Sequence, residues 1–152
     1  MYRNLVSIVA IFVISCGVMS TRDGHAFGFF DRYESVSAAG DALLIPVKAV
    51  DDGKAHYYVY KGSKAKIKFF VIKSSDGILR AAFDACDVCF REKKGYSQDG
   101  EFMICNNCGM RFHSSQINVV EGGCNPAPLH REIVGGNLVI KVKDILPGAR
   151  FF

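Results

Sequence analysis

The stretch KAKIKFFVIK, from Lys64 to Lys73, alternates lysines with apolar residues over its first half. Successive side chains of a β-strand point to opposite faces of the sheet, so this pattern predicts a strand with one face in water and the other in a core. Ser74 to Gly77 has the composition of a turn and leads into a second β-prone run, Ile78 to Phe83. The middle of the chain therefore predicts antiparallel strands.

Two further pairs of β-prone runs flank this stretch, residues 42–50 with 55–60 and residues 129–134 with 137–143. Turn residues separate each pair, Asp51 to Lys54 in the first and Gly135-Gly136 in the second, so each pair predicts a hairpin. The aromatic clusters Tyr57-Tyr58-Tyr60 and Phe69-Phe70 are interpreted as core packing and cross-strand pairs. The predicted fold class is mainly β, a small antiparallel sheet or barrel.

Cysteines form the strongest motif, in the loops between these strands. Cys86 and Cys89 are separated by two residues, Cys105 and Cys108 repeat that spacing fifteen residues later, and Cys124 follows. A C-x-x-C turn presents two thiolates on one side of a tight knuckle, and two such knuckles supply four sulfurs to one metal centre. The spacing is typical of metal ribbons and predicts a metal site at the first four cysteines.

Other readings of the cysteines stay open. Two disulfides are possible in an oxidising compartment, although five mature cysteines leave one unpaired. A thioredoxin-like dithiol would need a βαβ pattern, which neither knuckle has. Cys124 is a fifth ligand, a resolving thiol or a buried small residue.

The histidines and the basic run near the knuckles are weaker candidates. His113 could replace a thiolate or cap the site, but a solvated neighbour is the more common role of such a histidine. His56 and His130 lie on predicted strands and are interpreted as surface residues. Arg91 to Lys94 is interpreted as a solvated face that could also steer an acidic redox partner.

The N-terminal 26 residues predict export. Arg3 precedes the uncharged stretch from Leu5 to Met19, which is typical of a signal sequence and short for a membrane span. Two processing sites fit this signal sequence. One is a lipoprotein box, at which Cys16 would be lipidated, and the other is a cleavage site after Ala26. We expect residues 1–26 to be a signal or anchor, 27–41 a linker with a short helical turn, and 42–152 a cysteine-rich β domain on the periplasmic side.

Composition limits the remaining functions. The chain has 152 residues and is 49% hydrophobic, so it is too small for a multidomain enzyme and too apolar for a disordered chain. Its net charge of +4 is spread along the chain, which argues against a nucleic-acid partner. No catalytic base, activated nucleophile or phosphate loop is recognisable, so an electron carrier is favoured over a hydrolase or transferase.

The segment from Asp51 to Leu129 resembles a known family. DGKAHYYVYKG, IKFFVIKSSDGILRAAFDACDVC, KKGYSQDGEFMICNNCGMRF and GGCNPAPL together are similar to the FtrD-like family of membrane iron–sulfur proteins. The resemblance implies that Cys86, Cys89, Cys105, Cys108 and Cys124 hold an iron–sulfur cluster. It also implies membrane association and a role in electron transfer or bacterial iron transport, with a membrane iron-transport or redox protein as partner. Larger family members have several membrane spans, so an accessory fits this chain better than a permease.

The sequence leaves two candidates for the bound group, a zinc ion and an iron–sulfur cluster. Arg3-Asn4 is not a twin arginine, so the chain should be exported unfolded, whereas iron–sulfur clusters are assembled in folded protein before export. That chemistry favours zinc, and the resemblance favours iron–sulfur. The first hypothesis is therefore an exported iron–sulfur protein, and the alternative is a structural zinc ribbon in a protein-binding module.

Overall fold

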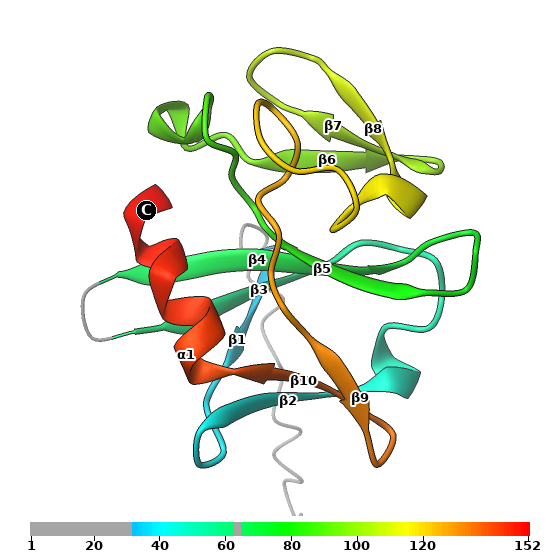
Figure 1. Ribbon diagram of the computed structural model, residues 1–152, viewed down its shortest axis with the longest axis vertical. Helices are drawn as coiled ribbons and strands as arrows, with labels where there is room; N and C mark the ends of the chain where they lie inside the picture. The colour runs from blue at the N-terminus through cyan, green and yellow to red at the C-terminus, as the bar shows by residue number, and fades with distance from the viewer. Residues whose placement is uncertain (1–31, 63–64) are drawn as a thin grey trace, which may run out of the picture.

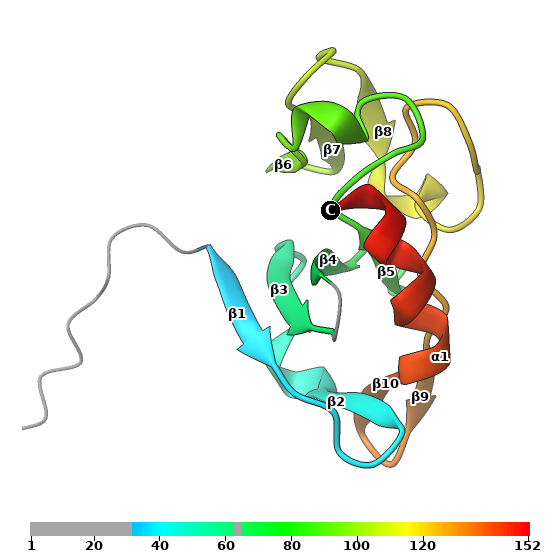
Figure 2. The same ribbon diagram turned by 90° about the vertical axis from the view of Figure 1, so that its left-hand side faces the viewer.

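The computed structural model describes residues 32–62 and 65–152. Three small sheets are stacked along the long axis, with β6-β7-β8 at one end, β1-β3-β4-β5 in the middle and β2-β10-β9 at the other end (Figures 1 and 2). The strands are β1 Tyr33–Val36, β2 Ala42–Pro46, β3 His56–Lys61, β4 Lys66–Lys73, β5 Leu79–Phe83, β6 Tyr96–Asp99, β7 Phe102–Cys105, β8 Arg111–His113, β9 Glu132–Val134 and β10 Asn137–Lys141. The mainly β expectation is confirmed, with open sheets rather than a barrel.

Strand β4 is the centre of the middle sheet and pairs antiparallel with β3 and β5. The predicted alternation holds over its first half, where Ile67 and Phe69 are buried and Lys66 is exposed. The second half is buried on both faces, because Phe70 and Ile72 pack against the β6-β7-β8 sheet instead of facing water. The expectation of one wet face is therefore correct only for the start of β4.

The aromatic clusters pack as predicted. Tyr58 lies opposite Phe69 across the β3–β4 pair, and their rings are stacked with centroids 5.4 Å apart. Tyr57 lies opposite Phe70 on the other face of the sheet. These two aromatic pairs put one apolar layer on each side of the middle sheet.

The predicted hairpin of residues 42–50 and 55–60 is wrong. Strand β2 pairs with β10, and β3 pairs with β1 and β4. Strand β2 ends at Pro46, and the 3₁₀ turn η1, Val47–Ala49, redirects the chain from one sheet to another. The β9–β10 hairpin around Gly135-Gly136 is confirmed, although the first strand begins at Glu132.

The segment expected to be a linker, residues 27–41, contains a strand in its described part. Strand β1 lies parallel to β3 along the edge of the middle sheet. The ring of Tyr33 meets that of Tyr57 edge-on at 5.9 Å. Four residues are too few to show a strand period, so packing rather than pattern makes this a strand.

A helical segment closes the C-terminal side. The short helix α1, Val142–Ile145, continues directly into the 3₁₀ turns of η4, Leu146–Phe151. In Figure 2 this segment runs from the β2-β10-β9 sheet past the middle sheet toward the β6-β7-β8 sheet. A Cβ atom at Gly148 would lie 2.1 Å from the ring of Phe83, so only glycine allows this close approach. Among the described residues, no helix has the length and apolarity that a membrane span requires.

Two apolar cores result from this stacking. The larger core lies between the middle sheet, the β2-β10-β9 sheet and the helical segment. The smaller core lies between the other face of the middle sheet and the β6-β7-β8 sheet, and it contains Cys86 and Cys105. The cysteine loops are therefore built on the smaller core, supported from below by β4 and β5.

Candidate metal centre

The first knuckle is the loop that leaves β5. The backbone N–H of Cys89 donates to the sulfur of Cys86 at 3.1 Å, so the loop curls around that sulfur. The N–H of Glu92 then donates to the carbonyl of Cys89, which begins the 3₁₀ turn η2, Phe90–Glu92. Cys86 is buried and Cys89 is half-buried, so the knuckle presents its sulfurs at the boundary of the smaller core.

The second knuckle closes the end of the β7–β8 hairpin. The N–H of Gly109 donates to the carbonyl of Cys105 at 2.8 Å, and the N–H of Cys105 donates to the carbonyl of Met110 at 2.9 Å. Gly109 has φ +74°, a left-handed conformation that glycine adopts without steric cost. Cys105 is buried and Cys108 is exposed, so this knuckle spans from the core to the surface.

Hydrogen bonds hold the three cysteine segments together. The N–H of Asn106 donates to the carbonyl of Gly95, which joins the second knuckle to the chain that follows the first. The hydroxyl of Tyr96 donates to the carbonyl of Cys124 at 2.6 Å, and the N–H of Ala127 donates to the carbonyl of Ala85 at 2.9 Å. These bonds bring Cys124 beside the first knuckle.

Five cysteine sulfurs meet at one place in two overlapping groups. Cys86, Cys89 and Cys124 form one group, and Cys89, Cys105 and Cys108 form the other; within each, all sulfurs lie within 4.8 Å of one another. All five are free thiols, and the sulfurs of Cys89 and Cys124 are 3.7 Å apart. We call these five residues the cysteine centre. Cys16, the sixth cysteine, lies outside the described residues, as does the predicted cleavage site after Ala26.

The surroundings shift the pKa of three of these thiols. Burial raises the pKa of Cys124 to about 12 and that of Cys105 to about 11, whereas the backbone N–H of Met110 lowers the pKa of Cys108. Metal binding requires deprotonated thiolates, so a metal entering this centre must displace protons from Cys105 and Cys124. The donor set is soft sulfur throughout, which suits zinc, copper(I) and iron–sulfur clusters.

Asp84 is a supporting residue that sequence reasoning missed. It is 3% exposed and lies two residues before Cys86. Its Oδ1 accepts from the N–H of Tyr96, and its Oδ2 accepts from the hydroxyl of Tyr33 at 2.5 Å and from the guanidinium of Arg32 at 2.8 Å. Burial raises the pKa of Asp84, and the three donors oppose that rise. A Cβ at Gly95 would lie 2.3 Å from the carboxylate, so the chain can pass there only as glycine.

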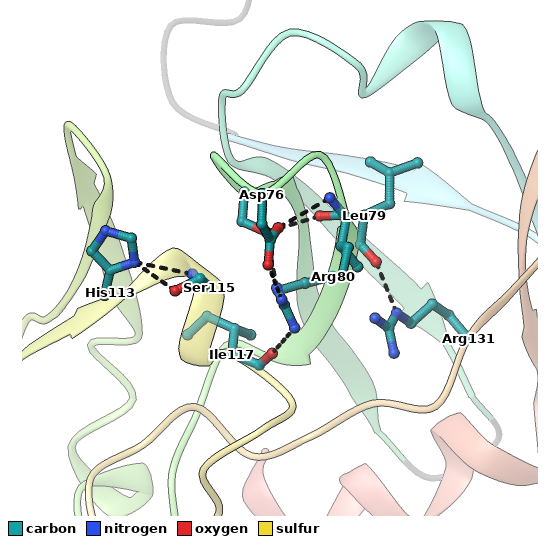
Figure 3. A network of polar contacts seen from close by, with 9 residues as sticks. Asp76, Leu79, Arg80, His113, Ser115, Ile117 and Arg131 are labelled. Carbon is teal, nitrogen blue, oxygen red and sulfur yellow. Dashed lines mark hydrogen bonds and ion pairs between the residues drawn. The ribbon is translucent and has the colours of Figure 1, made fainter.

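A second buried network anchors the segment that leads to Cys124 (Figure 3). Arg80 of β5 is 5% exposed, donates to the carbonyl of Ile117 at 3.1 Å and pairs with Asp76. The N–H of Ala81 donates to the side chain of Asn118, so this segment is bonded to β5 at two points. The same figure shows Arg131, which donates to the carbonyl of Leu79 at 3.0 Å. These bonds fix the start and end of the loop that carries Cys124.

The three described histidines, His56, His113 and His130, are not part of the cysteine centre. His113 is opposite Phe102 in the β7–β8 pair, whereas Cys105 lies three residues further along, a separation of about 10 Å at ~3.3 Å per residue. The His113 ring contacts Ser115 and Glu101, so it satisfies its polar atoms without a metal. Within the described ranges, neither cysteine group contains a histidine. His56 and His130 also have carboxylate partners. Asp52 pairs with His56, and Asp144 pairs with His130.

Comparison with known proteins agrees with this arrangement. The family model described as "Membrane iron-sulfur containing protein FtrD-like" matches residues 50–152. The chain belongs to the FtrD-like family. The match includes all five residues of the cysteine centre and supports an iron–sulfur, membrane-associated protein. Comparison with curated proteins gave no match.

Among solved structures, the quaternary ammonium Rieske monooxygenase CntA in complex with an inhibitor is similar to 65% of this chain, with 16% sequence identity and a TM-score of 0.44. The chain spans 30% of the length of that protein.

Proposed function

We propose that this FtrD-like protein is an exported, membrane-associated iron–sulfur protein that carries electrons for an iron-uptake or respiratory system. The observation that carries the proposal is the convergence of five free thiols in two groups that share Cys89. Thiolates are the ligands that iron–sulfur clusters require, and four of them suffice, so the centre holds one sulfur more than a cluster needs. Family membership supports iron–sulfur over other soft metals.

The residues around the centre divide it into a protected and an accessible side. Cys86 and Cys105 lie in the smaller core beneath Tyr96 and Ile117, which exclude water from that side. Cys108 is exposed, so a partner can approach the centre there. An iron–sulfur cluster held in this way supplies one-electron redox chemistry.

The basic run after the first knuckle suits an acidic partner. Arg91, Lys93 and Lys94 are exposed, as expected from the sequence, and Glu92 is the one acidic residue among them. The positive electrostatic potential of these residues raises the rate of encounter with an acidic redox protein. This effect weakens as ionic strength rises. We propose a membrane iron-transport or redox protein as that partner.

Metal analysis of anaerobically purified protein tests the proposal. We expect iron and acid-labile sulfide, a visible absorption band, and bleaching of that band by dithionite. A colourless protein with one zinc per chain would refute the redox function. It would still agree with the prediction that the cysteines bind a metal. The Cys89→Ser variant, purified in parallel, gives the spectrum of the chain without a complete site.

A structural zinc ribbon is the second candidate, and the small space between the sulfurs favours it. Zinc–sulfur bonds of about 2.3 Å in a tetrahedron place the sulfurs about 3.8 Å apart, close to the 3.7 Å between Cys89 and Cys124. The space bordered by Cys86, Cys89 and Cys105 is also only about 10 Å³, the size of a single small occupant. Under this reading the metal stabilises the β6-β7-β8 sheet for protein binding.

The N-terminal segment is proposed to deliver the domain to the periplasmic face of the membrane. Mass measurement of the mature N-terminus separates lipidation at Cys16 from cleavage after Ala26. Fatty-acid labelling that survives Cys16→Ala would exclude lipidation at Cys16.

A further inference from the structure

A second cavity lies directly beside the cysteine centre. It has a volume of about 250 Å³, far above the roughly 10–15 Å³ that one water needs on the same measure. Tyr33 of β1, Lys66 and Lys68 of β4, and Asp84 and Lys93 border it. Asp84 and Lys93 also border the small space between the cysteines, so a molecule in this cavity would be a neighbour of the centre.

Positive charge dominates the wall of this cavity. Three of its bordering residues are lysines, Lys66, Lys68 and Lys93, and none forms an ion pair within residues 32–62 and 65–152. The carboxylate of Asp84 is bound by Arg32 and by Tyr33, so it does not pair with the lysines. The Lys68 ammonium lies over the Tyr33 ring, 4.6 Å from its centroid, and keeps its full charge there. With three lysines and one aspartate, the cavity wall therefore has an excess of positive charge.

The sheet itself brings these lysines together. Residues two apart on β4 share a face, so Lys66 and Lys68 lie on the side that carries Phe70 and faces the β6-β7-β8 sheet. Lys66 is also directly opposite Lys61 of β3, a like-charge pair that destabilises a sheet. An anion held at this face would offset that repulsion.

The backbone at Lys93 is a third observation. Lys93 has φ 53° and ψ 25°, a left-handed conformation that is uncommon for a residue with a side chain. Its N–H donates to the carbonyl of Phe90 and ends η2, a position that glycine usually fills. A lysine at such a position, bordering both cavities, indicates a use for its ammonium group.

We propose that this cavity binds a small anion with two or more carboxylate or phosphate groups beside the cysteine centre. Lysines act as point charges toward both kinds of oxyanion, and three of them in one cavity select multiply charged ligands over singly charged ones. Tyr33 borders the same cavity, with its hydroxyl bonded to Asp84 and the Lys68 ammonium over its ring. The inference concerns binding alone, so it stands whichever metal the centre holds.

Isothermal titration calorimetry on the full chain with its metal tests the proposal. Citrate and pyrophosphate are the probes, and acetate is the singly charged control. We expect one saturable site for at least one probe, with acetate binding at least about tenfold more weakly, because its single charge makes fewer ion contacts. The absence of saturable binding by both probes would overturn the proposal.

Charge-matched variants separate the cavity from general attraction. Lys66→Gln with Lys68→Gln should weaken binding about tenfold or more, whereas Lys48→Gln with Lys143→Gln removes the same charge from exposed sites outside the cavity and should leave affinity within about twofold. Lys93→Gly suits the left-handed backbone, so it removes the ammonium group without strain and should weaken binding severalfold. Equal weakening by both double variants would overturn the proposal, and unchanged metal content verifies that each variant is folded.

Discussion

At the scale of single residues, Cys89 is the member of the cysteine centre that belongs to both sulfur groups. Cys108 and Cys124 each belong to one group, so replacing either leaves the other group complete. We expect Cys89→Ser to lose the metal on purification, and Cys108→Ser or Cys124→Ser to retain it with lower affinity. Metal content after dialysis against a graded series of chelator measures this order. Equal retention by all three variants would remove the shared role assigned to Cys89.

Asp84 is the residue on which the support of the first knuckle depends. In Asp84→Asn an amide N–H₂ faces Arg32, Tyr33 or the N–H of Tyr96, so at least one buried donor loses its acceptor. We expect the free energy of unfolding to fall by about 1–3 kcal/mol. Urea unfolding of the metal-loaded protein measures it. Asp99→Asn, which breaks the exposed pair with Arg111, is the matched control and should cost less than about 1 kcal/mol.

The knuckle cysteines can be recognised from the sequence alone, whereas the residues that support them cannot. The C-x-x-C spacing makes four of the cysteines recognisable in the sequence, because the ligands of one knuckle are neighbours in the chain. These four are Cys86, Cys89, Cys105 and Cys108. Asp84 has no such signal, since its partner Arg32 is 52 residues away in a segment expected to be a linker. The sequence does not assign a role to Cys124 for the same reason, because its place beside Cys89 depends on tertiary contacts.

At the scale of elements, the sequence predicts turns between neighbouring strands correctly, but it does not predict which distant strands pair. The turn from Ser74 to Gly77 and the β9–β10 hairpin are both encoded in a few adjacent residues, and both are found. Turn-forming residues at Asp51 to Lys54 suggested a hairpin of the same kind. Strand β2 instead pairs with β10, about 95 residues later, and that choice depends on which apolar face each strand must bury.

The β4–β5 turn carries a pH dependence that can be measured. Hydrogen bonds from Ser74 and from the N–H of Ile78, together with Arg80, hold the pKa of Asp76 at about 2, below its ordinary value. A lowered pKa means that this carboxylate stabilises the fold above its unfolded pKa near 4, and that the contribution disappears as pH falls from about 4 to about 2. We expect Asp76→Asn to lower stability at neutral pH and to flatten the stability profile across that window. Urea unfolding from pH 2 to pH 6 measures it, and parallel profiles for the two proteins would contradict it.

At the scale of the whole molecule, we expect the two cores to differ in their dependence on a bound metal. The larger core is closed by two sheets and the C-terminal helical segment, whereas the smaller core contains Cys86 and Cys105 and has Cys89 and Cys124 packed against it. Removing the metal should therefore loosen residues 96–124 and leave the larger core folded. Hydrogen exchange of the chelated protein should show lost protection in β6, β7 and β8 and retained protection in β2, β4 and β10. Uniform loss across all six strands would show that the cores fold as one unit.

The bond between Arg32 and Asp84 has a mechanical consequence. The guanidinium of Arg32, just ahead of strand β1, binds the carboxylate that lies two positions before Cys86. A pull applied to the chain ahead of this arginine would reach the first knuckle through this ion pair as well as the middle sheet through β1. With the N-terminal attachment proposed above, tension on the chain would therefore be transmitted to the thiols of the first knuckle.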